Sequence, residues 1–223
     1  MIPFTTDEFL GVFAHYNLTV WPAQVLLYGV AVCAIGLAIQ QRFDASGAIS
    51  VILAALWLWS GVVYHLIFFS TVNKPAYLFA ALFIAQSISV MYMGVWRREL
   101  RFRFSGNLSG LVGGGLVLYA LVIYPTLNYQ FEHMYPNMPT FGVPCPTTIF
   151  TFGILTWADG GLRPSMLIIP VGWSLLGFSA ALSLGMVEDF GLVAAALLVS
   201  LLSFWKLQRE SSKRRAPRHV PPD

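Results

Sequence analysis

The chain has 223 residues, of which 57% are hydrophobic and 10% are charged, and its formal net charge is +3. A typical soluble domain is about one quarter charged, so this chain lacks the polar surface that a globular protein needs in water. The composition therefore excludes an ordinary soluble domain and predicts an integral membrane protein built as one domain, residues 1–208.

The first predicted element is a short helix, residues 6–16, that lies on the outer membrane interface. Thr5 and Glu8 have the spacing of a capping box, and Phe4 with Phe9 fits a hydrophobic staple. The apolar stripe that follows consists of Phe9, Leu10 and Phe13. One apolar face on a helix of this length is typical of an interfacial helix rather than a spanning one.

Seven membrane-spanning helices are predicted after this element. A helix needs roughly 20 apolar residues to cross a hydrocarbon layer of about 30 Å. The predicted spans are residues 20–40, 48–70, 75–96, 108–128, 141–158, 165–184 and 190–205. The fifth span is short by itself, because its apolar run covers only residues 147–158, and it crosses only if it begins near Phe141. The predicted fold class is an all-α polytopic transmembrane helix bundle.

The basic residues predict the orientation of the bundle. With seven spans and the N-terminus outside, all of the 13 lysines and arginines except Lys74 fall on the inner side, which is the positive-inside pattern. Omitting the fifth span would place the basic C-terminus outside. Residues 209–223 are predicted to form a disordered, basic cytoplasmic tail. The stretches WRRELRFR and KLQRESSKRRAPR are expected to contact anionic lipid headgroups, and we predict no nucleic-acid partner.

One ionisable side chain, His65, is predicted well inside a span, about 7 Å from its outer end. It belongs to a stripe with spacings of three and four, which faces the bundle rather than lipid. The stripe consists of Trp57, Ser60, Gly61, Tyr64 and His65. One interpretation is a histidine that is hydrogen-bonded inside the bundle to Tyr64, Asn17 or Gln24. The other is a functional site, because intramembrane ionisable residues are costly.

Most other candidate residues are predicted on the outer side. The loop YQFEHMYPNMPTFGVP, residues 129–144, holds three prolines and no lysine or arginine, and we expect it to fold back over the bundle as a lid. Glu188 and Asp189 are assigned to another outer loop, which leaves the spans without an acidic group and argues against a proton-coupled pump. The candidate functional residues are His65, Tyr64, Trp57, Glu132, His133, Cys145 and His15.

Cys145 lies between two prolines where the extended loop is predicted to enter the fifth span. Pro144 disfavours helical backbone at Val143, and Pro146 suits the first turn of a helix. Cys145 is then either a small apolar filler or a reactive thiol or metal ligand, because a helix N-terminus lowers the pKa of a thiol. Cys33 is predicted about 20 Å deep, too far for a disulfide, which requires Cα atoms within about 7 Å.

Several short pieces carry a resemblance to a known family: PFTTDEF, YNLTVWPAQ, LWLWSGVVYHLIFF, WRRELRFRF and FGVPCPTTIFTFG. They resemble bacterial multi-pass membrane proteins that are catalogued only as a domain of unknown function. The resemblance extends from about Pro3 to the last span. It implies a protein of the bacterial inner membrane, and it implies no activity, substrate or catalytic residue.

Three classes of function stay open. The first is a transporter or channel for a small, uncharged or soft solute, with a site at the outer end of the bundle. The second is a non-catalytic accessory or scaffold subunit of a membrane complex, so an oligomer or a partner subunit stays open. The third is a metal- or redox-active membrane protein that uses His65 and Cys145. An enzyme ranks last because no catalytic motif is present, and the identity of any metal or cofactor is unknown.

Overall fold

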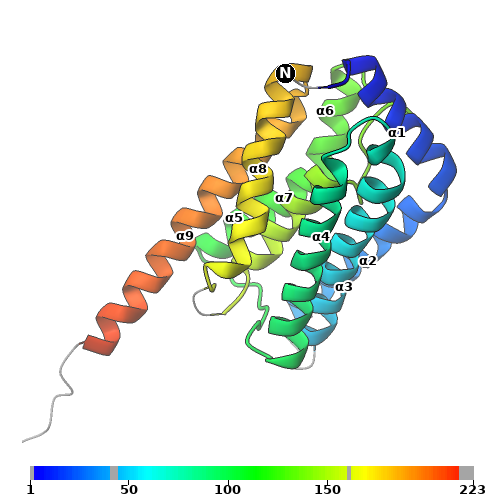
Figure 1. The fold of residues 1–223 in the computed structure, drawn as a ribbon. Coiled ribbons are helices and arrows are strands. Elements are labelled where there is room, and N and C mark those ends of the chain that lie inside the picture. The colour runs from blue at the N-terminus through cyan, green and yellow to red at the C-terminus, as the bar shows by residue number, and fades with distance from the viewer. Residues whose placement is uncertain (1–2, 41–44, 160–161, 216–223) are drawn as a thin grey trace, which may run out of the picture.

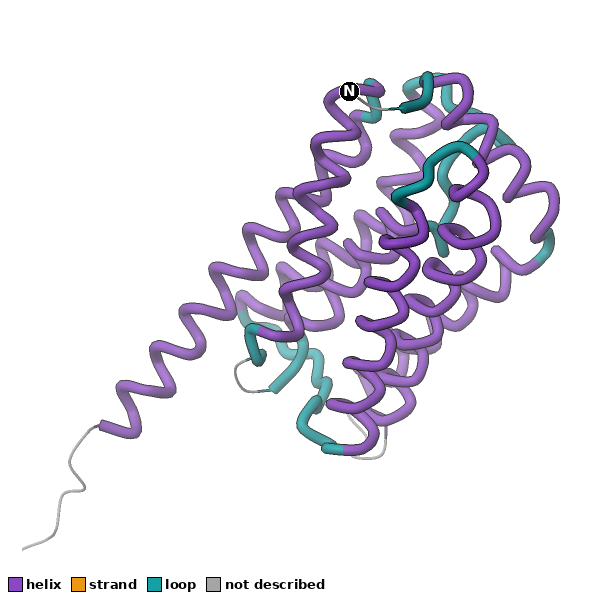
Figure 2. The backbone as a smooth tube through the Cα atoms, in the orientation of Figure 1, coloured by secondary structure: helices purple, strands orange, loops and turns teal. Residues whose placement is uncertain are grey.

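The computed structural model describes residues 3–40, 45–159 and 162–215, and all regular structure within these ranges is helical (Figures 1 and 2). In chain order the elements are α1 (Thr6–Val20), α2 (Ala23–Gln40), α3 (Ala45–Trp59), η1 (Ser60–Phe68), η2 (Phe69–Thr71), α4 (Ala76–Met91), η3 (Tyr92–Trp96), α5 (Leu108–Leu118), η4 (Tyr119–Ile123), α6 (Tyr124–Gln130), α7 (Pro144–Thr156), α8 (Ser165–Leu184), η5 (Val187–Asp189) and α9 (Phe190–Arg215). The elements η1, η3 and η4 are π-helical continuations of the α-helices before them.

Six helical segments are long and apolar enough to cross a membrane: Ala23–Gln40, Ala45–Thr71, Ala76–Trp96, Leu108–Gln130, Ser165–Leu184 and Val187–Gln208. Each presents large apolar side chains on the outside of the bundle, among them Leu26, Leu66, Leu78, Leu111, Leu175 and Leu201. Apolar surface on this scale is unfavourable in water and suits lipid. The fold is that of a multi-pass membrane protein.

The N-terminal helix α1 begins as the sequence predicts. The Thr5 hydroxyl accepts a hydrogen bond from the Glu8 amide at 3.2 Å, and the Glu8 carboxylate accepts one from the Thr5 amide at 2.8 Å, which confirms the capping box. These bonds hold the pKa of Glu8 below its ordinary value. Phe4 and Phe9 stack at 5.6 Å as the predicted staple. The helix continues to Val20, four residues beyond its predicted end.

Helix α7 occupies the middle of the bundle. It packs against α3, α5, α8 and α9 (Figure 1), and every residue of α7 except Cys145 is buried. The helix has 13 residues, about 20 Å of rise, whereas a spanning helix needs about 30 Å. The fifth predicted span, 141–158, is therefore not one continuous helix, and the structure replaces its first part with extended chain.

The extended chain before α7 runs into the bundle with its carbonyl groups bonded to side chains. Asn17 in α1 donates to the carbonyls of Pro136 and Met138 at 2.7 and 2.8 Å. Ser60 in η1 donates to the carbonyl of Gly142 at 2.7 Å. Non-helical backbone is tolerated at membrane depth only where it is buried in protein and satisfied there. Side chains from neighbouring elements donate the hydrogen bonds that these carbonyls would accept from backbone amides in a helix.

The two ends of the bundle differ in charge. At one end, which we call the basic end, Glu99 forms ion pairs with Arg97 and Arg163 at 3.0 and 2.9 Å. Lys206 donates to the carbonyl of Thr156, the last residue of α7. The opposite end carries α1 and is called the α1 end. Helix α7 and the chain before it thus connect the α1 end to the basic end.

The predictions for the C-terminal tail and for Arg42 concern charged segments that the structure describes only in part. The tail was predicted to be disordered from residue 209, but α9 continues as a helix to Arg215, beyond the rest of the bundle (Figure 1). Lysine, arginine, glutamate and glutamine are good helix formers, so the apolar helix extends into the charged segment. Residues 216–223 and Arg42 lie outside the described residues.

Candidate functional site

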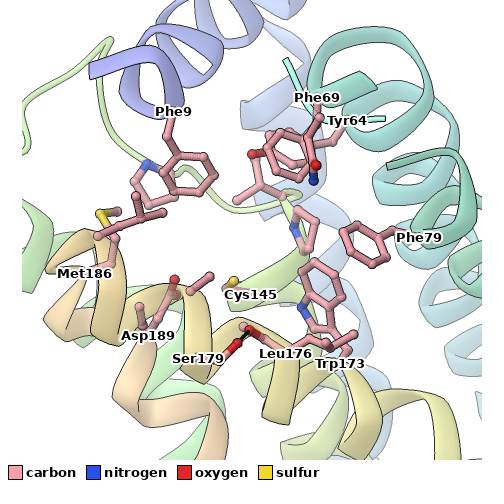
Figure 3. A pocket seen from close by; sticks show the side chains of 18 of the residues that line it. Phe9, Tyr64, Phe69, Phe79, Cys145, Trp173, Leu176, Ser179, Met186 and Asp189 are labelled. Atoms are coloured by element: carbon pink, nitrogen blue, oxygen red, sulfur yellow. Dashed lines mark hydrogen bonds between the residues drawn. The ribbon is translucent and has the colours of Figure 1, made fainter. Parts of the chain in front are cut away.

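A cavity of about 260 Å³ opens at the α1 end of the bundle (Figure 3). Its walls come from the N-terminal segment with α1, from η1, α4 and α8, and from the chain that enters α7. Most of the lining is aromatic or aliphatic, and the lining contains no lysine, arginine or histidine of the described chain. We call this cavity the outer pocket, because the α1 end is the predicted outer end.

Cys145 lies at the floor of the outer pocket, in the first turn of α7 (Figure 3). Val143 has extended backbone with ψ 165°, as predicted for a residue before proline, and α7 begins at Pro144. A Cβ atom at Gly177 would lie 4.0 Å from both the Cys145 sulfur and the Trp173 indole nitrogen. The absence of a side chain at Gly177 therefore leaves room in front of the thiol.

A carboxylate, Asp189, also lines the pocket beside Cys145. It is 5% exposed, and its Oδ1 accepts a hydrogen bond from the Tyr124 hydroxyl at 2.6 Å. The preceding residue, Glu188, is fully buried and lies 3.3 Å from His133 Nδ1. The sequence analysis assigned both acids to an outer loop and missed them. Their position at the start of an apolar helix was the available signal.

His65 is buried as predicted, but it does not line the outer pocket. Its ring packs among aromatic rings, with Phe83 at 4.8 Å and Trp173 at 5.1 Å. Neither ring nitrogen has a hydrogen-bond partner, so the expected bond to Tyr64, Asn17 or Gln24 is not formed. Trp173 lies against His65 on the side of α8 and separates it from the outer pocket, so a site centred on His65 stays a prediction.

The remaining predicted residues divide between the pocket and other places. Tyr64 is buried, lines the pocket and stacks on Phe13 at 5.6 Å. Trp57 lies deeper and donates to the Thr151 hydroxyl at 3.0 Å, which makes it a packing residue. Glu132 is exposed with φ 64°, and His15 is exposed beside Phe68. His133 does not line the pocket, but it contacts Glu188, the residue before Asp189.

Side chains that could ligate a metal ion are few in and around the pocket. Within the described residues, no three histidine, cysteine, aspartate or glutamate side chains are close enough to share a metal ion. Cys33 and Cys145 are both free thiols, and Cys33 lies exposed on α2. The pocket instead combines an apolar wall with two polar groups on its floor, the Cys145 thiol and the Asp189 carboxylate.

Comparison with known proteins identifies the family but not an activity. The chain belongs to a family described as a family of unknown function (DUF6064), whose model matches residues 6–214. This confirms the resemblance to a domain of unknown function. No curated protein and no solved structure matches the chain.

Proposed function

We propose that this protein binds a small, lipid-soluble molecule in the outer pocket and carries it between the bilayer and the outer side of a bacterial inner membrane. The observation that supports the proposal is the pocket itself, an apolar cavity with a few polar groups gathered at its floor. Ligand sites in proteins have this composition: apolar walls supply affinity, and a small number of polar groups fix the orientation of the ligand.

The position of the pocket favours a ligand that enters from lipid. Leu176 and Ser179 on α8 line the pocket and are also exposed on the surface of the bundle. Phe4 in the N-terminal segment and Phe79 on α4 also line the pocket. Because α8, and α4 together with η3, are long enough to span a membrane, a molecule dissolved in the bilayer could reach the pocket between these two helices.

A pocket-filling variant tests the proposal. Gly177→Leu adds a side chain in front of Cys145 and Trp173, and its nearest other neighbour is the end of the flexible Leu192 side chain. We expect (3,3-dimethylbutyl)benzene, a neutral apolar probe, to bind the purified wild-type protein and to slow alkylation of Cys145 by N-ethylmaleimide. Binding to Gly177→Leu should be at least about tenfold weaker, because interiors are close-packed and leave no spare room.

The matched control is Gly172→Leu in the same helix, since a Cβ atom there meets nothing within 4 Å. This variant should bind the probe as the wild-type protein does. Equilibrium dialysis measures the affinity, and peptide mass spectrometry measures the alkylation of Cys145 separately from that of the exposed Cys33. Equal binding by the wild-type protein and Gly177→Leu would refute the outer pocket as the binding site.

A further inference from the structure

The charge of Asp189 is not balanced by the protein around it. Its hydrogen bond comes from a neutral hydroxyl, that of Tyr124. No lysine, arginine or histidine forms an ion pair with Asp189 in the part of the chain that the structure describes. A buried carboxylate without a compensating charge is costly, so such groups are paired with a cation or carry a proton.

The neighbouring acid, Glu188, is in contact with a histidine, His133. His133 Nδ1 lies 3.3 Å from Glu188 Oε1, while Glu188 Oε2 is buried and has no partner. Glu188 and Asp189, the two acids at the start of the last span, therefore have one histidine near them, and it contacts Glu188. One histidine can balance at most one carboxylate, and Asp189 is the acid that lines the pocket.

The walls opposite Asp189 are suited to a positive charge. Aromatic side chains line the pocket: Phe4, Phe9, Phe13, Tyr64, Phe69 and Phe79. The faces of aromatic rings attract cations, and a cage of rings is a known way to hold a quaternary ammonium group. The described lining contains no basic side chain that would repel such a group or occupy Asp189 in its place.

We propose that the ligand of the outer pocket is a lipid-soluble organic cation with a single positive charge, and that it exchanges with a proton on Asp189. The inference rests on the proposed function and names its substrate class. When the cation enters, its ammonium group pairs with the Asp189 carboxylate, and the carboxyl proton leaves to water. When the cation leaves, a proton from water returns to the carboxylate. No covalent bond to the ligand forms or breaks.

Several titratable groups face Asp189 and belong to the same equilibrium. They are Tyr124 in α6, Tyr119 in η4, Cys145 in α7, Tyr64 in η1, Glu188 in η5 and His133 in the loop after α6. Helix α8 contributes no ionisable side chain to the pocket, and neither does the described beginning of α9. His133 has 16% of its side chain exposed, and Tyr119 and Cys145 are also only partly buried.

A pair of probes with the same shape and different charge tests the inference. Trimethyl(phenethyl)ammonium carries a permanent charge, and (3,3-dimethylbutyl)benzene is its neutral carbon analogue. We expect the purified wild-type protein to bind the cation at least about tenfold more tightly at pH 8 than at pH 5, because a proton competes for the carboxylate. The neutral analogue should bind equally at both values.

The variant Asp189→Asn removes the charge and keeps the shape of the side chain. It should lose both the preference for the cation over the neutral analogue and the pH dependence, whereas the control Gly172→Leu should keep both. If the neutral analogue binds but the cation binds no better at pH 8 than at pH 5, the inference is wrong and the proposed function stands. If the wild-type protein binds neither probe, both are wrong.

Discussion

Asn17 is a single residue that holds three parts of the molecule together. It is fully buried near the end of α1. Its amide nitrogen donates to the extended chain before α7, and its Oδ1 accepts from the Thr140 hydroxyl at 2.8 Å. Gln24 in α2 donates to the Asn17 carbonyl at 2.9 Å. The side chain and the backbone carbonyl of Asn17 thus connect α1, α2 and the loop that lines the outer pocket.

Replacing Asn17 with aspartate should destabilise the protein strongly. Asn17→Asp keeps the size of the side chain but exchanges two donated hydrogen bonds for a carboxylate that faces two carbonyl oxygens. The expected loss is about 2–4 kcal/mol of unfolding free energy, since a buried group that loses its partners bears its full desolvation cost. Asn137→Asp, at an exposed position of the same loop, should change little. Thermal unfolding in detergent measures both, and equal melting temperatures would contradict this role.

Among single residues, the sequence predicted the position of Cys145, whereas the place of Asp189 in the site depends on how the fold buries it. The prolines fixed where α7 begins, so the place of Cys145 could be read from its neighbours. The sequence places Asp189 at the start of an apolar helix, but it does not say whether the short turn before that helix is covered by other residues. The turn η5 is covered by Tyr119 and Tyr124, whose hydroxyls bond to Glu188 and Asp189. Both tyrosines are distant from Glu188 and Asp189 in the sequence, and no sequence motif links them to the two acids.

Among the helices, the contact between α5 and α7 depends on glycine. A Cβ atom at Gly113 would collide with Thr156 and Trp157, and one at Gly153 would lie 2.9 Å from the Gly113 carbonyl. Small residues let two helix backbones approach closely in lipid, where apolar side chains alone give no reason to associate. The close approach keeps α7 inside the bundle.

Two neighbouring glycines provide a matched test of this contact. Gly113→Val places a branched side chain against α7 and should cost at least about 1–3 kcal/mol, the usual cost of overpacking. Gly114→Val adds the same side chain where nothing lies within 4 Å and should be tolerated. Size-exclusion profiles after heating measure the difference. Similar profiles for the two variants would show that the crossing is not tight.

The helices of the bundle could be predicted from hydropathy with the exception of α7. Long apolar runs predict the six helices that could span a membrane, because lipid imposes the same requirement on each of them. Helix α7 faces protein on all sides, so hydropathy does not set its length. Its 13 residues are completed by extended chain, whose hydrogen bonds to Asn17 and Ser60 come from remote parts of the sequence.

For the whole molecule, the distribution of charge predicts a direction in the membrane. Arg97, Arg163 and Lys206 lie at the basic end, and Lys74 follows η2, whose chain leaves the bundle at the α1 end. Cytoplasmic loops carry the excess of lysine and arginine in membrane proteins. The basic end is therefore predicted to face the cytoplasm, and the outer pocket the opposite side.

Reporter fusions test this orientation. An alkaline phosphatase fused after Gln208 should be inactive, because this enzyme folds only outside the cytoplasm, whereas a fusion after Lys74 should be active. Green fluorescent protein at the same two positions should give the opposite result. An active phosphatase after Gln208 would mean that the segment of residues 131–158 does not cross the membrane.

The dependence of α7 on its surroundings has a consequence for how the protein is made. A translocon passes a segment into lipid when that segment is apolar and hydrogen-bonded within itself. The extended chain before α7 is not hydrogen-bonded within itself, and its carbonyl groups find partners only in the side chains of Asn17, Ser60 and Asn128. Two of these donors, Asn17 and Ser60, are synthesised before it, so we expect the central segment to insert only after α1 and η1 are in place. It would enter only as α8 and α9 close around it, which makes the middle of the molecule the last part to be built.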